Sequence, residues 1–156
     1  MPGRPYLVIV RAGDESLHPS WLDTCGSNRS WDLLVSYFGD NARSFHHAHD
    51  IRFDLKGPKW SAVHHILSRF PALRTHYTYI WIPDDDLHCT GNDIDMLFET
   101  CAQFELLLAQ PSLAPASFIS HQITIQNTAC WVRLTNFVEI MAVACSTATL
   151  ELRNNC

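Results

Sequence analysis

The most constraining stretch of this 156-residue sequence is residues 78–87, which read Thr-Tyr-Ile-Trp-Ile-Pro-Asp-Asp-Asp-Leu. Four residues that favour β-structure run into Pro83 and then into Asp84, Asp85 and Asp86. Carboxylates this close repel one another unless solvent or a cation screens them, so stability alone explains the run poorly. Mg²⁺ and Mn²⁺ prefer carboxylate oxygen and usually share their coordination shell with substrate phosphates. The stretch therefore predicts a metal and phosphate site at the carboxyl end of a central strand, and a solvated acidic turn is the alternative.

The rest of the sequence predicts an α/β fold in which apolar strands alternate with helices. Ligands in such sheets bind outside the carboxyl ends of the strands, and Asp40 and the three aspartates both follow predicted strands. Residues 17–25 read as a loop or short helix, and residues 42–53 are rich in histidine without a strong period. The predicted strands are 6–11, 31–38, 78–82, 105–110, 118–126 and 129–134. Three helices are predicted: 58–71, with an apolar stripe of Trp60, Val63, Leu67 and Phe70; one capped by Asn92, with an apolar stripe of Ile94, Leu97, Phe98 and Cys101; and 137–152, with an interruption near residues 145–146.

Composition narrows the class of protein. Hydrophobic residues make up 47% of the chain and charged residues 17%, which is typical of a globular protein, and we expect one domain over residues 1–156. A net charge of -5 argues against a nucleic-acid partner bound by phosphate neutralisation, but permits a nucleotide whose charge a metal balances. We expect no transmembrane segment and no signal peptide. The six cysteines lack metal-site spacing, so we expect reduced thiols and a cytoplasmic protein.

Three further side chains are candidates for chemistry. Lys56 and Lys59 bracket the start of the predicted helix 58–71, where ammonium groups and free N–H groups suit a phosphate; ordinary surface lysines are the alternative. Glu139 is one acid among apolar neighbours, either a partly buried base or acceptor contact or the exposed face of a helix. The nine histidines form no zinc pattern, and the motifs of serine hydrolases, P-loops and dinucleotide sites are absent from the sequence.

The acidic strand also carries a resemblance. Residues 77–87 resemble the Asp-x-Asp strand of GT-A-type glycosyltransferases, and the chain is similar to the family called domain of unknown function 707. The resemblance implies a GT-A-like (Rossmann-like) mixed sheet flanked by helices. Residues 143–145 depart from the family's Pro-x-Phe, and the chain stops before its Gly-x-Asp segment, so we expect the domain to be incomplete at its C-terminus. The matching pieces are residues 31–40, 59–60, 84–87, 108–113, 120–124 and 135–141.

The resemblance implies roles for individual residues. Asp84 and Asp86 would hold a divalent cation, manganese or magnesium, on the diphosphate of a nucleotide-sugar donor. Asp40 and Asp85 join the two lysines as candidate donor-binding residues, with Asp40 placed for the nucleoside. On the acceptor side it implies Gln110, His121 and Glu139, and Glu139 is the candidate catalytic residue.

Three functions remain open from the sequence. The first is a metal-dependent glycosyltransferase that transfers a sugar to an unknown acceptor. The second is a non-catalytic nucleotide-sugar-binding or interaction module, and the third is another metal-dependent enzyme acting on phosphate. Because an incomplete sheet domain would expose apolar surface, we also expect self-association.

Overall fold

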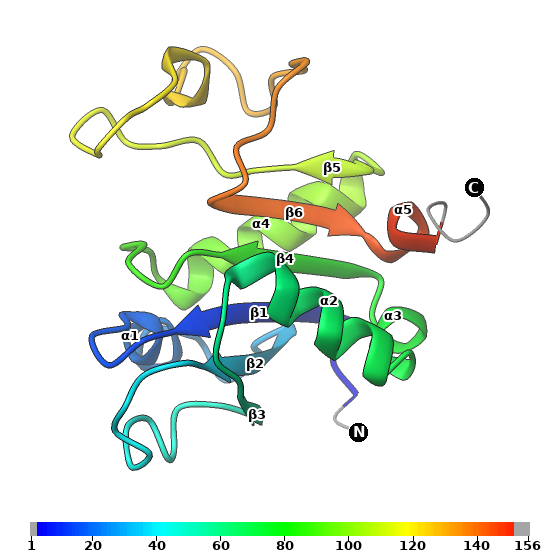
Figure 1. Cartoon of the computed structure of the whole chain (residues 1–156). Coiled ribbons are helices and arrows are strands. Elements are labelled where there is room, and N and C mark those ends of the chain that lie inside the picture. Colours follow the sequence, from blue (N-terminus) through cyan, green and yellow to red (C-terminus); the bar gives the residue numbers. More distant parts are fainter. Residues whose placement is uncertain (1–2, 152–156) are drawn as a thin grey trace.

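A single mixed sheet of six strands organises the protein, and helices cover both of its faces (Figure 1). The computed structural model describes residues 3–151. The elements in chain order are β1 (Tyr6–Ala12), α1 (His18–Asp23), β2 (Trp31–Tyr37), β3 (Ile51–Asp54), α2 (Lys59–Arg69), α3 (Ala72–His76), β4 (Tyr79–Pro83), α4 (Gly91–Gln103), β5 (Leu108–Ala109), the short 3₁₀ helix η1 (Gln122–Thr124), β6 (Ala142–Ser146) and α5 (Thr147–Glu151).

The order of the strands reverses in the middle of the sheet. Across the sheet the order is β3-β2-β1-β4-β6-β5, with the first four strands parallel. Strand β6 runs antiparallel to both of its neighbours. The chain therefore builds outward from β1 to β3 and then crosses back to place β4 on the other side of β1, as in Rossmann-like folds. The predicted α/β class, a Rossmann-like mixed sheet flanked by helices, is confirmed at this level.

Alternation along β1 divides the core into two layers. Val8 and Val10 face the side that α1 and α4 cover, where Trp21 and Phe98 are fully buried. Leu7 and Ile9 face the opposite side, where α2 and α3 pack. Every residue of β2 is buried, as expected for a parallel strand with helices on both faces. In the view of Figure 1, α2 lies in front of the sheet and α4 behind it.

The predictions for the central strands and for α2 are confirmed to within one or two residues at each end. Residues 17–25 contain the short helix α1. Two elements were not predicted from the sequence. Strand β3 forms at the end of the histidine-rich stretch, and helix α3 begins directly after Pro71. Val63 and Leu67 are buried on α2 as predicted, together with Ala62 and Ile66, but Trp60 and Phe70, predicted on the same stripe, are 40% and 39% exposed.

The strands predicted for residues 105–110, 118–126 and 129–134 are wrong. Only β5 forms within the first of these, and the exposed side chains of Leu107 and Leu108 show that it is an edge rather than a buried strand. Residues 110–141 are otherwise irregular apart from η1 and one isolated bridge between Leu113 and Ile125. A strand needs a neighbouring strand to satisfy its backbone, and apart from that bridge these residues pair with no strand in the described part of the chain.

The helix predicted for residues 137–152 is also wrong over most of its length. Residues Ala142–Ser146 form β6, and only Thr147–Glu151 are helical; residue 152 lies outside the described residues. The reason is tertiary, since β6 fills the position between β4 and β5. The indole N–H of Trp81 donates to the carbonyl oxygen of Ala142 at 2.9 Å.

The helix cap was predicted two residues too late. Thr90, not Asn92, is the N-cap of α4, because its side chain pairs reciprocally with Asp93. The cysteines among residues 3–151 are free. None of the helices in this range combines the length and the hydropathy that a membrane span requires.

Candidate functional site

The acidic turn lies where the strand order reverses, beside the carboxyl end of β1. Two hydrogen bonds clamp it to the loop that follows β1: the backbone N–H of Gly13 donates to the carboxylate of Asp85 at 2.7 Å, and the N–H of Leu17 donates to the carbonyl oxygen of Asp85 at 2.7 Å. In open α/β sheets, ligands bind in the crevice at this reversal. Asp85 thus joins the two central strands at their carboxyl ends, and its predicted contact with a donor stays a prediction.

Asp84 is paired with the first residue of α2. The ammonium of Lys59 lies 2.7 Å from Asp84 Oδ1, and it also donates to the carbonyl oxygens of Ile140 at 3.1 Å and Met141 at 3.4 Å. The Lys59 side chain is only 16% exposed, and that of Asp84 is 43% exposed. Burial lowers the pKa of Lys59 from its ordinary value, while the carboxylate of Asp84 acts in the opposite direction. Lys59 is therefore an internal cation of the site and not an ordinary surface lysine.

The donor set around the turn suits a hard cation that brings further ligands with it. Asp86 is exposed next to the half-exposed Asp84. Among residues 3–151, no three His, Cys, Asp or Glu side chains come together as a metal-binding group. The two carboxylates could hold Mg²⁺ or Mn²⁺ that completes its shell with phosphate and water, and the ammonium of Lys59 could pair with such a phosphate; they do not suit a metal held by protein side chains alone.

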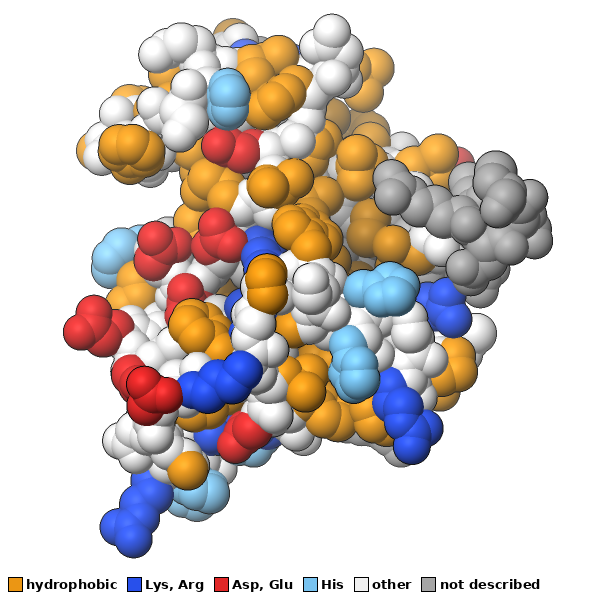
Figure 2. Space-filling model, in the orientation of Figure 1, with side chains coloured by type: hydrophobic (Ala, Val, Ile, Leu, Met, Phe, Trp, Pro, Cys, Tyr) orange, Lys and Arg blue, Asp and Glu red, His pale blue; other side chains and the backbone are white. Residues whose placement is uncertain are grey.

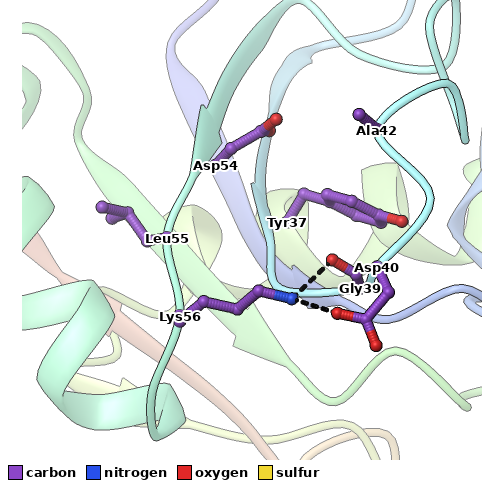
Figure 3. A pocket seen from close by; sticks show the side chains of 7 residues that line it. All are labelled: Tyr37, Gly39, Asp40, Ala42, Asp54, Leu55 and Lys56. Carbon is purple, nitrogen blue, oxygen red and sulfur yellow. Dashed lines mark hydrogen bonds and ion pairs between the residues drawn. The ribbon is translucent and has the colours of Figure 1, made fainter.

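Lys56 and Asp40 lie together one strand further along the sheet (Figure 3). The ammonium of Lys56 donates to Asp40 Oδ1 at 2.7 Å and to the carbonyl oxygens of Phe38 at 2.6 Å and Gly39 at 2.7 Å. Both side chains are exposed and border a pocket of about 260 Å³. The pocket is lined by Tyr37, Gly39, Asp40, Ala42, Asp54, Leu55 and Lys56.

Asp14 belongs to the same edge of the sheet and was not singled out from the sequence. Its carboxylate accepts hydrogen bonds from the Tyr37 hydroxyl and from the backbone N–H of Asp40 at 3.0 Å. These two bonds, the hydroxyl first, lower the pKa of Asp14. A side chain at residue 39 would crowd this pair, since a Cβ would lie 2.5 Å from the Tyr37 hydroxyl oxygen and 2.6 Å from Asp14 Oδ1. The sequence signal that could have identified Asp14 is its position, because Asp14 follows a predicted strand just as Asp40 does.

Arg11 was also missed, because it lies inside a predicted buried strand. It is 4% exposed, and its guanidinium donates to the carbonyl oxygens of Ser36 at 3.1 Å, Leu55 at 2.8 Å and Gly57 at 2.5 Å. These bonds hold the loop between β3 and α2 against the sheet. Arg11 therefore positions the segment from which Lys56 and Lys59 project.

The predicted acceptor-side residues come from one segment and contact one another in part. Gln110 accepts a hydrogen bond from the backbone N–H of Glu139 through its side-chain oxygen. The His121 ring lies 4.7 Å from that of Phe137, two residues before Glu139. Glu139 Oε2 is buried and has no hydrogen-bond partner among the described residues. The turn after Glu139 meets the acidic turn, where the Asp84 N–H donates to Met141 O at 2.6 Å.

Charge gathers at this end of the molecule. The arrowheads of β1 and β4 point to the left in Figure 1, and Figure 2 shows acidic side chains collected on the same side, with lysine or arginine side chains beside them. The segment of residues 110–141 extends above the sheet in the same view (Figure 1). An anionic ligand at this end of the sheet needs cations to balance the carboxylates, and Lys56 and Lys59 are two sources of positive charge there.

Comparison with known proteins adds no family. No protein-family model matches this chain, and none of the curated proteins matches it.

Proposed function

We propose that this protein is a metal-dependent, GT-A-like glycosyltransferase-type protein, which binds a nucleotide-sugar donor and transfers the sugar to an acceptor. The observation that carries the proposal is the position of the acidic turn, between the carboxyl ends of β1 and β4 where the strand order reverses. The resemblance of residues 77–87 to an Asp-x-Asp strand narrows the ligand from any phosphate compound to a sugar nucleotide.

Each residue of the site has a role in this proposal that follows from its position. A divalent cation held by Asp84 and Asp86 would neutralise the nucleoside diphosphate as it leaves. Lys59 donates to the phosphate oxygens from the start of α2, and Asp40, beside the pocket in Figure 3, accepts from hydroxyl groups of the nucleoside. Glu139 is assigned as the base that accepts the proton of the attacking acceptor hydroxyl, because the turn that follows it contacts the acidic turn through the bond from the Asp84 N–H to Met141 O.

One observation favours a binding module without transfer as the second candidate. The donor-side residues lie at the ends of paired strands, whereas Gln110, His121 and Glu139 lie on residues 110–141, which make one isolated bridge. Catalysis requires reacting groups to be held in productive geometry, and irregular segments hold them less well than strands do. Donor binding without transfer is the outcome expected of this candidate.

Calorimetry with a panel of nucleotide sugars, with and without Mn²⁺, tests the proposal. We expect donor binding that depends on Mn²⁺ and falls at least about tenfold in the Asp84→Asn, Asp86→Asn double variant, because each charged contact contributes on the order of 1–3 kcal/mol. The matched control is Asp23→Asn with Glu99→Gln, two exposed acids on α1 and α4 whose replacement changes net charge equally.

The outcomes separate the candidate functions. Binding that ignores Mn²⁺, or that both double variants weaken equally, contradicts the proposed site. Binding accompanied by sugar transfer or donor hydrolysis supports the transferase, and binding alone across many acceptors supports the module. Turnover of phosphate esters without sugar transfer would assign the third class, another phosphate-processing enzyme.

A further inference from the structure

The Lys59 ammonium occupies a cation position at the acidic turn. It lies among three oxygen atoms, those of Asp84 at 2.7 Å, Ile140 at 3.1 Å and Met141 at 3.4 Å. These oxygens come from two segments that meet at the turn, the carboxyl end of β4 and the residues before β6. The Lys59 side chain is 16% exposed, so the ammonium is largely shielded from solvent at this position.

A metal ion and this ammonium cannot share Asp84 without cost. The carboxylate oxygen that accepts from Lys59 is one of the few ligands that the turn offers, because no group of three metal-binding side chains exists within residues 3–151. A divalent cation placed on Asp84 would stand beside a positive charge in a partly buried setting, where like charges repel strongly. Binding of the metal therefore favours departure of the ammonium.

The surroundings allow Lys59 to leave Asp84. Met141 O keeps a hydrogen bond when the ammonium departs, because the Asp84 N–H donates to it at 2.6 Å. Ile140 is 66% exposed, so its carbonyl oxygen lies on a residue at the surface. Lys59 is the first residue of α2, and the free N–H groups of that turn attract the same anion as its ammonium does.

We propose that Lys59 is an exchangeable counter-ion: it neutralises Asp84 in the empty site and transfers to the donor diphosphate when the metal takes Asp84. The proposal rests on the proposed function, since it assumes that metal and diphosphate meet at this turn. Its consequence is cooperativity. The metal alone binds weakly because it must displace the ammonium, and the diphosphate gives the ammonium a new partner, so each ligand strengthens the binding of the other.

Removal of the ammonium should have opposite effects on the two ligands. In Lys59→Met, we expect Mn²⁺ alone to bind about tenfold more tightly than in the wild type, and uridine, guanosine or adenosine diphosphate without metal to bind about tenfold more weakly. Loss of the free Mn²⁺ signal in electron paramagnetic resonance measures the first affinity, and calorimetry in a chelator measures the second. General damage to the fold would weaken both.

Two variants complete the experiment. Lys56→Met removes the same charge from the neighbouring pair with Asp40, so a general electrostatic effect would change Mn²⁺ affinity equally in both methionine variants, and that result overturns the proposal. Lys59→Arg keeps the charge and should bind Mn²⁺ alone as weakly as the wild type does.

Failure of this inference differs from failure of the proposed function. If the wild type binds Mn²⁺ with a nucleoside diphosphate but Lys59→Met binds Mn²⁺ alone no better, the exchange is wrong and the donor site stands. If the wild type binds neither ligand, separately or together, the proposed function and the exchange both fall.

Discussion

At the scale of single residues, the buried side chain of His18 makes the stability of this protein depend on pH. It is fully buried at the start of α1, and its Nδ1 shares a hydrogen bond with the Ser16 hydroxyl at 2.7 Å. The Phe45 ring lies 4.6 Å from the imidazole. Burial lowers the pKa of His18 from 6.5 to about 4; the backbone of Ala48 acts in the opposite direction, and the nearby His49 and Arg52 add to the lowering. The folded protein therefore contains the neutral imidazole.

Stability should fall between about pH 6.5 and pH 4 because of this residue. In that window the unfolded state binds a proton that the folded state does not, so the free energy of unfolding decreases by up to about 3 kcal/mol as the pH is lowered. Urea denaturation at pH 7.5, 5.5 and 4.5 measures the effect. His18→Leu should remove this part of the slope, whereas His64→Gln, at an exposed position on α2, should keep it. An unchanged slope in His18→Leu would contradict the assignment.

Single residues could be identified from the sequence where the signal lay within a short stretch of the chain. The acidic turn was found because three aspartates follow a strand and a proline. Arg11 and Asp14 were missed for the opposite reason, since each acts through groups far away in the chain. Arg11 donates to Gly57 O, 46 residues along, and Asp14 accepts from Asp40 N, 26 residues along. No spacing rule connects such pairs before the sheet exists.

At the scale of elements, the cap of α4 determines how the chain leaves the acidic turn. The Thr90 side chain accepts from the Asp93 N–H at 3.1 Å, and Asp93 Oδ2 accepts from the Thr90 N–H at 2.7 Å. The following residue must be small, since a Cβ on Gly91 would lie 2.4 Å from Cys25 Cβ and 2.5 Å from the carbonyl oxygen of Trp21 in α1. The helix therefore begins against α1, only a few residues after Asp86.

Loss of this cap should destabilise the protein measurably. Thr90→Ala removes one acceptor for the free N–H groups of α4, and we expect about 1 kcal/mol less free energy of unfolding. Thr90→Ser keeps the hydroxyl and should restore most of the loss. Denaturant unfolding of the three proteins provides the comparison, and an equal loss in the serine and alanine variants would mean that packing of the methyl group, rather than the cap, is responsible.

Across the whole molecule, apolar exposure is concentrated on one segment. Residues 110–141 carry Phe118 at 90% exposure, Leu134 at 86% and Trp131 at 70%, while the side chains of β1 and β2 are almost entirely buried. Isolated apolar side chains are normal at a surface, but several large ones on one segment mark a surface that favours association. The self-association expected from the sequence therefore stays a prediction, and the structure indicates the segment on which to test it.

We predict concentration-dependent association that involves this segment. Replacement of Phe118, Trp131 and Leu134 by serine together should weaken the association by on the order of tenfold or more, because buried aromatic side chains dominate interfaces. Sedimentation equilibrium over a range of concentrations measures the change. The control is Met96→Ser, which removes an apolar side chain, 42% exposed, from α4. A monomeric wild type at all concentrations would contradict the prediction.

The sequence by itself determined the three central strands of this protein. Residues 6–11, 31–38 and 78–82 are apolar runs rich in strand-favouring side chains, and burial and β-propensity are properties that a local window contains. The strand before the acidic turn followed from the same reasoning, and so did the expectation that its aspartates lie at a carboxyl end.

Only the tertiary structure decided the secondary structure of the C-terminal part of the chain and the contacts between residues of the candidate site. Residues 118–126 resemble a strand but have no strand beside them, whereas β6 forms because a place exists between β4 and β5. The contact of Lys59 with Asp84 joins residues 25 positions apart, and it arises because α2 begins beside the end of β4. The physical reason is that backbone hydrogen bonds and counter-charges are satisfied by neighbours in space, which a linear pattern does not specify.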